Sequence, residues 1–158
     1  MKHTLSVLVE NKFGVLARVA GLFSARGFNI SSLAVGETHD PSVSRMTVVV
    51  DTPEVRILEQ IIKQLRKLID TISVVDLTKK DFIERELALV KVKYNKEVTG
   101  KVNALLIKHK RITRMLRHKN NEAIIEVCAT SEQVEEFIDN LKPCGVQELM
   151  RTGRVAVS

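Results

Sequence analysis

The first half of the chain changes repeatedly between the hydrophobic spacing of a strand and that of a helix. Leu5, Val7 and Val9 alternate with polar residues, which predicts a strand with one buried face. Apolar residues then recur at steps of three and four over 15–23, which predicts a helix with one apolar stripe. Gly27 follows this stripe, where a residue without Cβ readily adopts the left-handed conformation that ends a helix.

Two strands, a second helix and a further strand complete this half. Runs rich in Val, Ser and Thr predict strands over 30–35 and 44–51. Thr52-Pro53-Glu54 has the features of a helix start, namely an N-cap residue, a proline at the first helical position and an acid in the first turn. A strand over 71–77 closes the half. The apolar stripe of the second helix is expected to contain Val55, Leu58, Ile62, Leu65 and Ile69.

The order βαββαβ predicts a four-stranded antiparallel sheet with both helices on one face, the ferredoxin-like arrangement. After the polar joint Lys79-Lys80-Asp81 the same order recurs. The sequence therefore predicts an α+β protein with two ferredoxin-like domains in tandem, at 4–78 and 79–158. The expected elements of the second domain are a strand over 86–94, a helix over 98–106, strands over 114–117 and 123–129 around a turn at 119–122, a helix capped by Thr130 and Gln133 with the stripe Val134, Phe137, Ile138 and Leu141, and a strand over 146–150.

Composition restricts the class of protein. Of the 158 residues, 44% are hydrophobic and 28% are charged, which is typical of a globular protein and excludes disorder. Aromatic residues make up only 4%, which argues against a stacking platform for nucleic-acid bases. No apolar run approaches about 20 residues, and the strand pattern begins at Thr4, so we expect neither a membrane span nor a targeting segment. The expected location is a bacterial cytoplasm, or the plastid stroma if the chain is plastid-encoded.

Positive charge is concentrated in the second half of the chain. The net charge is +6, and the densest cluster of basic residues lies at 108–119. Such a patch attracts nucleic acid or an acidic protein surface. Lysines also protect sheet edges from aggregation, which is the simpler interpretation. Because no aromatic residues are interleaved, we expect a solvated surface or a protein contact here, and no nucleic acid.

No group of residues matches a catalytic or metal-binding pattern. Cys128 and Cys144 fit neither a disulfide framework nor a metal motif, so we expect two reduced, buried or semi-buried thiols. Nothing in the sequence places a base beside either thiol, as a catalytic cysteine would require. We therefore expect no catalytic and no metal-binding residues. The histidines are scattered, without a carboxylate or cysteine at ligand spacing: His3, His39, His109 and His118.

The corner Asn11-Lys12-Phe13-Gly14 precedes the first helix and has the chemistry of an anion site. The first N–H groups of a helix lack partners within it, and the helix dipole favours a negative charge there. Gly14 permits close approach of a ligand, and Asn29 offers a donor and an acceptor at the start of the next strand. An ordinary N-cap, an ordinary turn glycine and an ordinary loop asparagine explain the same spacing, and spacing alone favours that simpler interpretation.

A resemblance changes this balance. The run Asn-x-x-Gly-Val-Leu-x-Arg-Val-x-Gly-Leu-Phe-x-x-Arg-Gly-x-Asn-Ile, from Asn11 to Ile30, resembles the opening of the ACT domain in the small subunits of acetolactate synthase, also called acetohydroxyacid synthase. The resemblance covers essentially the whole chain and continues in four further runs. One departure is that 95–117 is more basic than the family usually shows. The matching runs are 32–36, 43–50, 85–92 and 151–156.

The resemblance implies a regulatory subunit that is not catalytic on its own. In this family the large subunit holds thiamine diphosphate, magnesium and FAD and joins pyruvate to a second 2-keto acid, so no cofactor is expected on the small subunit. The small subunit activates that catalytic subunit and confers feedback inhibition by valine or another branched-chain amino acid. Effectors sit between paired ACT domains, which implies a homodimer. The alternative is an ACT-type amino-acid sensor that regulates another enzyme or a nucleic acid through its basic second half.

Mapped onto this sequence, the resemblance also implies an effector site. The N–H groups around Gly14 would receive the effector carboxylate, and Asn11 or Asn29 would fix its polar end. Val35 and Gly36 are expected beside the pocket, where a larger residue at position 36 would intrude. Residues 79–158 are expected to contact the catalytic subunit. The full set of expected effector residues is Asn11, Gly14, Val15, Leu16, Asn29 and Ile30.

Overall fold

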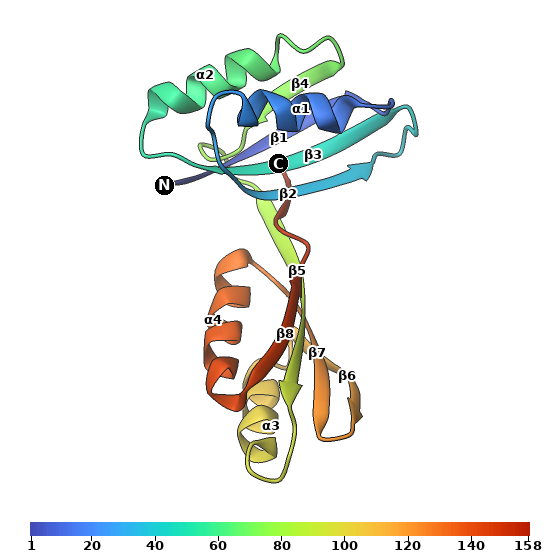
Figure 1. Ribbon diagram of the computed structural model, residues 1–158, viewed down its shortest axis with the longest axis vertical. Coiled ribbons are helices and arrows are strands. Elements are labelled where there is room, and N and C mark those ends of the chain that lie inside the picture. Colours follow the sequence, from blue (N-terminus) through green and yellow to red (C-terminus); the bar gives the residue numbers. More distant parts are fainter. The chain divides into compact units, whose positions relative to one another are not determined.

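The computed structural model describes residues 1–158 and divides into two compact units (Figure 1). The first unit contains residues 1–83 and 154–158, and the second contains residues 84–153. The sequence placed the boundary between residues 78 and 79 and gave the last five residues to the second domain. These five residues belong to the first unit because Arg154 is anchored there. Its backbone N–H donates to Ser32 Oγ (2.9 Å), and its Nη1 donates to Thr4 Oγ1 (2.9 Å).

The first unit has the predicted ferredoxin-like topology. Its sheet has the strand order β2-β3-β1-β4, with all three pairings antiparallel, and Figure 1 shows helices α1 and α2 together on one face. A short strand, β9, was not predicted and contacts β1. The bounds are β1 Lys2–Glu10, α1 Val15–Ser24, β2 Ile30–Glu37, β3 Val43–Asp51, α2 Val55–Leu65, β4 Thr71–Asp76 and β9 Val155–Val157.

The core of this unit lies between the sheet and the two helices. Side chains on the helix-facing side of β1 are fully buried against the apolar stripe of α1, as the alternation predicted. Gly27 has the predicted left-handed conformation after α1, with φ of 68°. The buried residues at the centre of this core are Leu5, Val7, Val9, Val19, Phe23, Met46 and Val48.

Helix α2 begins later and ends earlier than the sequence predicted. Thr52 does not cap the helix, because its hydroxyl accepts the Glu54 N–H (3.3 Å) ahead of it and the helix begins at Val55. Val55 is 50% exposed, and Ile69, which lies beyond the helix end, is 93% exposed. The buried face of α2 consists of Leu58, Ile61 and Leu65, so the prediction was wrong for Val55 and Ile69 and missed Ile61.

The other face of β1 is also buried, although the sequence predicted one buried face only. Thr4 and Ser6 point away from the helices and are almost completely inaccessible. Two guanidinium groups satisfy their hydroxyls, since Arg154 donates to Thr4 and Arg45 Nη1 donates to Ser6 Oγ (2.8 Å). Long basic side chains therefore cover this face of the sheet with their stems and bind its hydroxyls with their ends.

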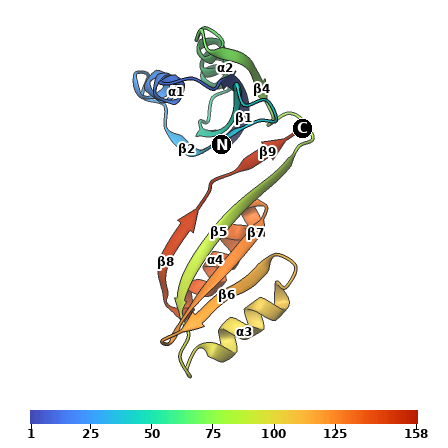
Figure 2. The ribbon, with the colours of Figure 1, turned by 90° about the vertical axis from the view of Figure 1, so that its right-hand side faces the viewer.

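The second unit repeats the topology, as predicted. Its sheet follows the order β6-β7-β5-β8, which Figure 2 shows from a second direction. Asn120 and Asn121, in the predicted turn between β6 and β7, both have positive φ. The bounds are β5 Ile83–Lys93, α3 Thr99–Lys108, β6 Thr113–Lys119, β7 Glu122–Ala129, α4 Ser131–Leu141, a 3-10 turn Lys142–Cys144 and β8 Val146–Arg151.

An ion pair between the buried Glu86 and the partly exposed Arg151 joins the first and last strands of the second unit. Glu86 on β5 accepts from Arg151 Nε (2.7 Å), and Glu135 on α4 accepts from Arg151 Nη1 (2.6 Å). The hydrogen bond to Glu86 is the main cause that raises the pKa of Arg151 above its ordinary value. The stripe predicted for α4 is buried, with Val134, Phe137, Ile138 and Leu141 in the core.

The capping box of α4 gives a first prediction. Gln133 N–H donates to Thr130 Oγ1 (3.3 Å), and Thr130 N–H donates to Gln133 Oε1 (3.3 Å). Thr130→Ala removes the acceptor and is expected to lower the free energy of unfolding by about 1 kcal/mol. Urea denaturation of the full chain measures this change. Ser24→Ala, at the exposed end of α1, is the control and should change stability little; equal stability of both variants would contradict the cap.

Candidate functional site

Helix α1 begins without a side-chain cap. Gly14 occupies the N-cap position with φ of 80°, a conformation that favours glycine, and no side chain accepts a hydrogen bond from the first turn. The Val15 N–H has only a long contact with the Lys12 carbonyl oxygen (3.4 Å). The first turn therefore presents N–H groups and the positive end of the helix dipole, which together favour a carboxylate.

Asn11 does not cap this helix but holds the corner against the end of β2. Its Nδ2 donates to Glu37 Oε1 (3.0 Å) and to the Pro41 carbonyl oxygen (2.9 Å), and its backbone N–H donates to the Ser42 carbonyl oxygen (2.6 Å). Both amide protons are thus used, and the acceptor Oδ1 remains for a ligand. A donor such as an ammonium group fits that atom and the neighbouring Glu37 carboxylate.

Arg18 is a site residue that the sequence reasoning missed. Its Nε and Nη2 both contact Asp70 Oδ2 at 2.7 Å, and Asp70 is buried in the turn before β4. Its Nη1 lies beside Gly14, where a Cβ atom would come within 3.1 Å of it. The spacing contained the signal, since residues four apart on a helix lie on the same face. A second positive group therefore stands at the helix start.

Apolar side chains surround the polar corner. Phe13 is fully exposed, and Leu16 and Val35 are about half exposed. Val15 is buried in the core, so only its backbone is available to a ligand. An exposed apolar group next to N–H donors is suited to a small molecule with one charged and one aliphatic end.

The charged residues near the corner are locally paired. The hydrogen bond from Lys12 to Glu10 (2.8 Å) raises the pKa of Lys12 above its ordinary value. In the loop after β2, the Ser42 hydroxyl and then its backbone N–H hold the pKa of Asp40 below its ordinary value. These contacts order the loop whose Pro41 and Ser42 carbonyls bind Asn11.

Asn29 and Ile30 lie at the other end of α1 and β2 from this corner. The ten residues of α1 separate the two positions by about 15 Å along the helix axis. One chain therefore does not bring all six expected effector residues together. β2 is an edge strand of its sheet, and Asn29 and Ile30 lie at the beginning of that edge.

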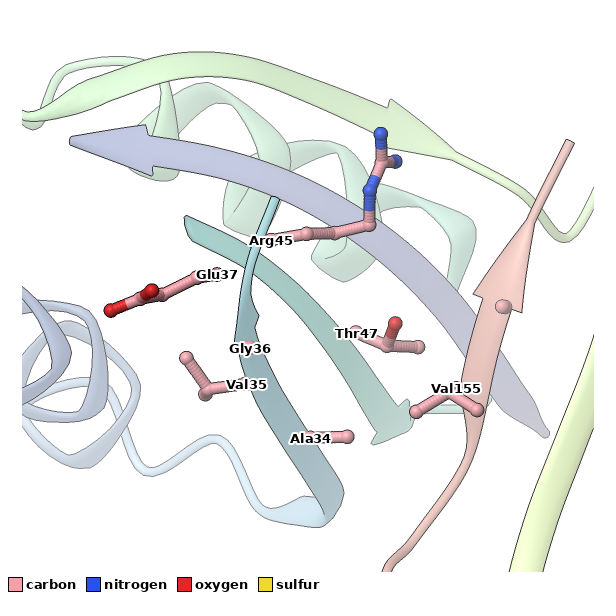
Figure 3. A pocket seen from close by; sticks show the side chains of 8 residues that line it. Ala34, Val35, Gly36, Glu37, Arg45, Thr47 and Val155 are labelled. Atoms are coloured by element: carbon pink, nitrogen blue, oxygen red, sulfur yellow. The ribbon is translucent and has the colours of Figure 1, made fainter. Parts of the chain in front are cut away.

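Val35 and Gly36 face opposite sides of the sheet. Val35 pairs in register with the core residue Met46 and is directed to the helix side, whereas Gly36 pairs with Arg45 on the other side. Gly36 lines a cavity of about 250 Å³ on this helix-free face, and Figure 3 shows Arg45 and Thr47 on the side of Val155. The residues that line it are Ala34, Val35, Gly36, Glu37, Arg45, Thr47, Val155 and Ala156.

The cysteines and the basic cluster belong to the second unit. Cys144 is buried and Cys128 is exposed, so the expectation of two buried or semi-buried thiols was wrong for Cys128, which points away from the core of its sheet. The basic cluster at 108–119 extends from the end of α3 through the edge strand β6. No three His, Cys, Asp or Glu side chains gather into a possible metal site. None of the helices is both long and apolar enough to span a bilayer.

Known proteins resemble both units. Residues 5–73 match the family described as "AHAS small subunit-like ACT domain", and residues 85–158 match the "small subunit of acetolactate synthase" family. The probable acetolactate synthase small subunit of Archaeoglobus fulgidus is 49% identical, over 99% of this chain and 96% of that protein. The chain belongs to the acetolactate synthase small-subunit family.

Other members of this family support the assignment along the whole chain. The acetolactate synthase small subunit of Bacillus subtilis is 36% identical, over 99% of this chain and 90% of that protein. The crystal structure of the acetolactate synthase small subunit from Thermotoga maritima superposes with a TM-score of 0.88 at 37% identity, covering 99% of this chain and 96% of that chain. The first unit of a chain in this family is the ACT domain, which contains the corner at Gly14.

The two glycines of this region give a matched pair of substitutions. Gly14→Ala places Cβ in a left-handed residue and within 3.1 Å of Arg18 Nη1, and should lower the free energy of unfolding by about 1–2 kcal/mol. Gly21→Ala lies inside α1, where Cβ meets nothing within 4 Å, and should raise stability by about 0.5–1 kcal/mol. Denaturant titration compares the two. A Gly14→Ala chain as stable as the parent would show that the strained N-cap is not required.

Proposed function

We propose that the chain is the non-catalytic regulatory subunit of a cytoplasmic acetolactate synthase, and that its ACT domain binds a branched-chain amino acid, valine first among them. Membership of the small-subunit family implies a catalytic large subunit as its partner. That subunit would hold thiamine diphosphate, Mg²⁺ and FAD and form 2-acetolactate from pyruvate. The observation that carries the proposal is the uncapped start of α1 at Gly14, with exposed apolar side chains beside it.

Each part of a valine molecule has a counterpart at this corner. The N–H groups of residues 14–16 and the Arg18 guanidinium would receive its carboxylate. The Asn11 Oδ1 atom and the Glu37 carboxylate would accept its ammonium group. Leu16 and Val35 would cover the isopropyl group, which gains about 1.5–3 kcal/mol on full burial. Discrimination among the branched-chain amino acids would therefore depend mainly on the shape of the pocket.

A second copy of the chain would complete the site. β2 lies at the sheet edge and contains neither proline nor lysine, the residues that commonly protect an edge from pairing. Antiparallel pairing of two β2 strands about a two-fold axis would place the beginning of each strand beside the end of the other. Asn29 and Ile30 of one chain would then lie next to the Gly14 corner of its partner.

The shared site also provides a mechanism of regulation. An effector that contacts both chains favours the dimer geometry in which its contacts are best, and so shifts the population of dimer states. A coupling of about 1–3 kcal/mol to the catalytic subunit is enough for a 5- to 150-fold change in apparent response. Residues 79–158, with their basic cluster, would provide the contact with that subunit.

Mixed dimers test both the effector and its shared site. Asn11→Ala and Asn29→Ala are each expected to abolish the rise in melting temperature that millimolar valine gives the parent chain. When equal amounts of the two variants are refolded together, half of the dimers are mixed and each of these regains one site with both asparagines intact, so the mixture should contain about a quarter of the parent's valine sites. Isothermal titration measures the number of sites.

Two outcomes would contradict this proposal. A site within one chain would leave the mixture as inactive as its parts, and no response to any of the three branched-chain amino acids would exclude the effector. The regulatory role is tested separately, by adding the chain to a matched catalytic subunit and assaying acetolactate formation with and without valine. Gly21→Ala, which lies on α1 away from the corner, is the control in both experiments.

A further inference from the structure

The cavity on the helix-free face of the ACT sheet is separate from the corner at Gly14. The pleat directs Gly36 and Arg45 to the face opposite the two helices, whereas α1 and its first turn lie on the helix side. Figure 3 shows the Arg45 and Thr47 side chains on the side of Val155, and Val35 and Glu37 directed the other way. A ligand in this cavity would therefore contact the side chains of Arg45 and Thr47, which the effector site does not use.

Arg45 gives the cavity a positive charge that no carboxylate neutralises. Its Nη1 donates to Ser6 Oγ at 2.8 Å, and it forms no ion pair. Glu37 has the carboxylate closest to Arg45 along the paired strands β2 and β3. However, it accepts a hydrogen bond from Asn11 and points away from the cavity in Figure 3. The guanidinium group has five N–H donors, so most of them remain for an anion at the edge of the cavity.

Thr47 adds a hydroxyl that has no hydrogen-bond partner within the protein. The residue is 3% exposed, lines the cavity and forms no hydrogen bond with another side chain or the backbone through its hydroxyl group. A hydroxyl that borders a cavity and has no protein partner is available to donate a hydrogen bond to a ligand oxygen. The remaining walls are aliphatic or bare backbone, from Ala34, Gly36 and Val155.

These features define the chemical class of the ligand. A carboxylate matches the Arg45 guanidinium, an adjacent oxygen matches the Thr47 hydroxyl, and a short aliphatic chain matches the walls. An ammonium group would face the guanidinium charge, and the Glu37 carboxylate that could pair with it points away from the cavity in Figure 3. We propose that this cavity binds a small aliphatic 2-oxo acid, at a second site distinct from the amino-acid site of the same domain.

Amide chemical shifts of the full-length, ¹⁵N-labelled chain test the proposal with 3-methyl-2-oxobutanoate as the probe. Its addition should shift the amides of Gly36, Arg45 and Thr47 and leave those of residues 14–16 unchanged. Two molecules of the same carbon skeleton are the ligand controls: valine, which carries an ammonium group, and 3-methyl-2-butanone, which lacks the carboxylate. Each should bind the cavity at least about tenfold more weakly, because it loses or opposes the charge-assisted contact.

Two substitutions address the same cavity from different sides. Gly36→Leu adds a side chain whose Cβ meets nothing within 4 Å; its remaining atoms should occupy the cavity and abolish the shifts. Arg45→Gln removes the charge and should weaken binding about ten- to a hundredfold. Arg56→Gln removes an exposed arginine of α2 and should leave binding unchanged.

Several results would overturn the proposal. Binding of the oxo acid that persists in Gly36→Leu would place the ligand elsewhere, and equal binding of the ketone would show an apolar void with no role for Arg45. Shifts confined to residues 14–16 would mean that the oxo acid occupies the amino-acid site. The proposed effector function would stand in all three cases, because it is measured by valine binding at the corner.

Discussion

The central strand of the ACT sheet constrains everything around it. β1 is hydrogen-bonded on both sides, to β3 and to β4, and both of its faces are buried. Its pleat sends apolar side chains to the helices and the hydroxyls of Thr4 and Ser6 to the opposite face. A buried hydroxyl needs a partner, and the arginines at 45 and 154 provide it. The same alternation therefore determines which face of the sheet the helices cover. It also places the hydroxyl of Thr4 where Arg154, near the end of the chain, binds it.

The corner at Gly14 depends on contacts that connect four elements. Asn11 joins the end of β1 to the end of β2 and the loop after it, and Arg18 joins α1 to Asp70 before β4. An uncapped helix start is consequently held in place by its surroundings, so the N–H groups are ordered before any ligand arrives. Preorganised donors bind an anion without a further loss of conformational freedom, so a short turn without a catalytic residue would be sufficient for the proposed recognition.

The sequence predicted the topology of both units because the hydrophobic spacing changes clearly between period 2 and period 3.6 at each element. It did less well where side-chain contacts decide the outcome. The hydroxyl of Thr52 binds ahead of α2 and moves the helix start, and the chain turns before Ile69 could join the stripe. β9 was missed because three residues, Val155–Val157, are too few for periodicity and are placed by Arg154.

The candidate site was predictable in part for similar reasons. Gly14 and Asn11 belong to a recognisable run, whereas Glu37 and Asp70 lie more than 20 residues from them and reach the corner only through side-chain contacts with Asn11 and Arg18. The separation of Asn29 from the corner follows from the length of α1, which the sequence contained. The cavity at Gly36 could not be anticipated, because one of its walls is the unpredicted strand β9.

Neighbouring residues of β2 connect the two faces of the ACT sheet. Val35 lies on the side of the amino-acid corner, and Gly36 forms part of the cavity on the other side. Because β2 is also the free edge, a change in how two chains pair would shift both positions together. A ligand on one face that favours one pairing geometry must then alter the affinity of the other face by the same factor in return. If each face binds its proposed ligand, β2 would couple the two sites through adjacent residues whose side chains point to opposite faces.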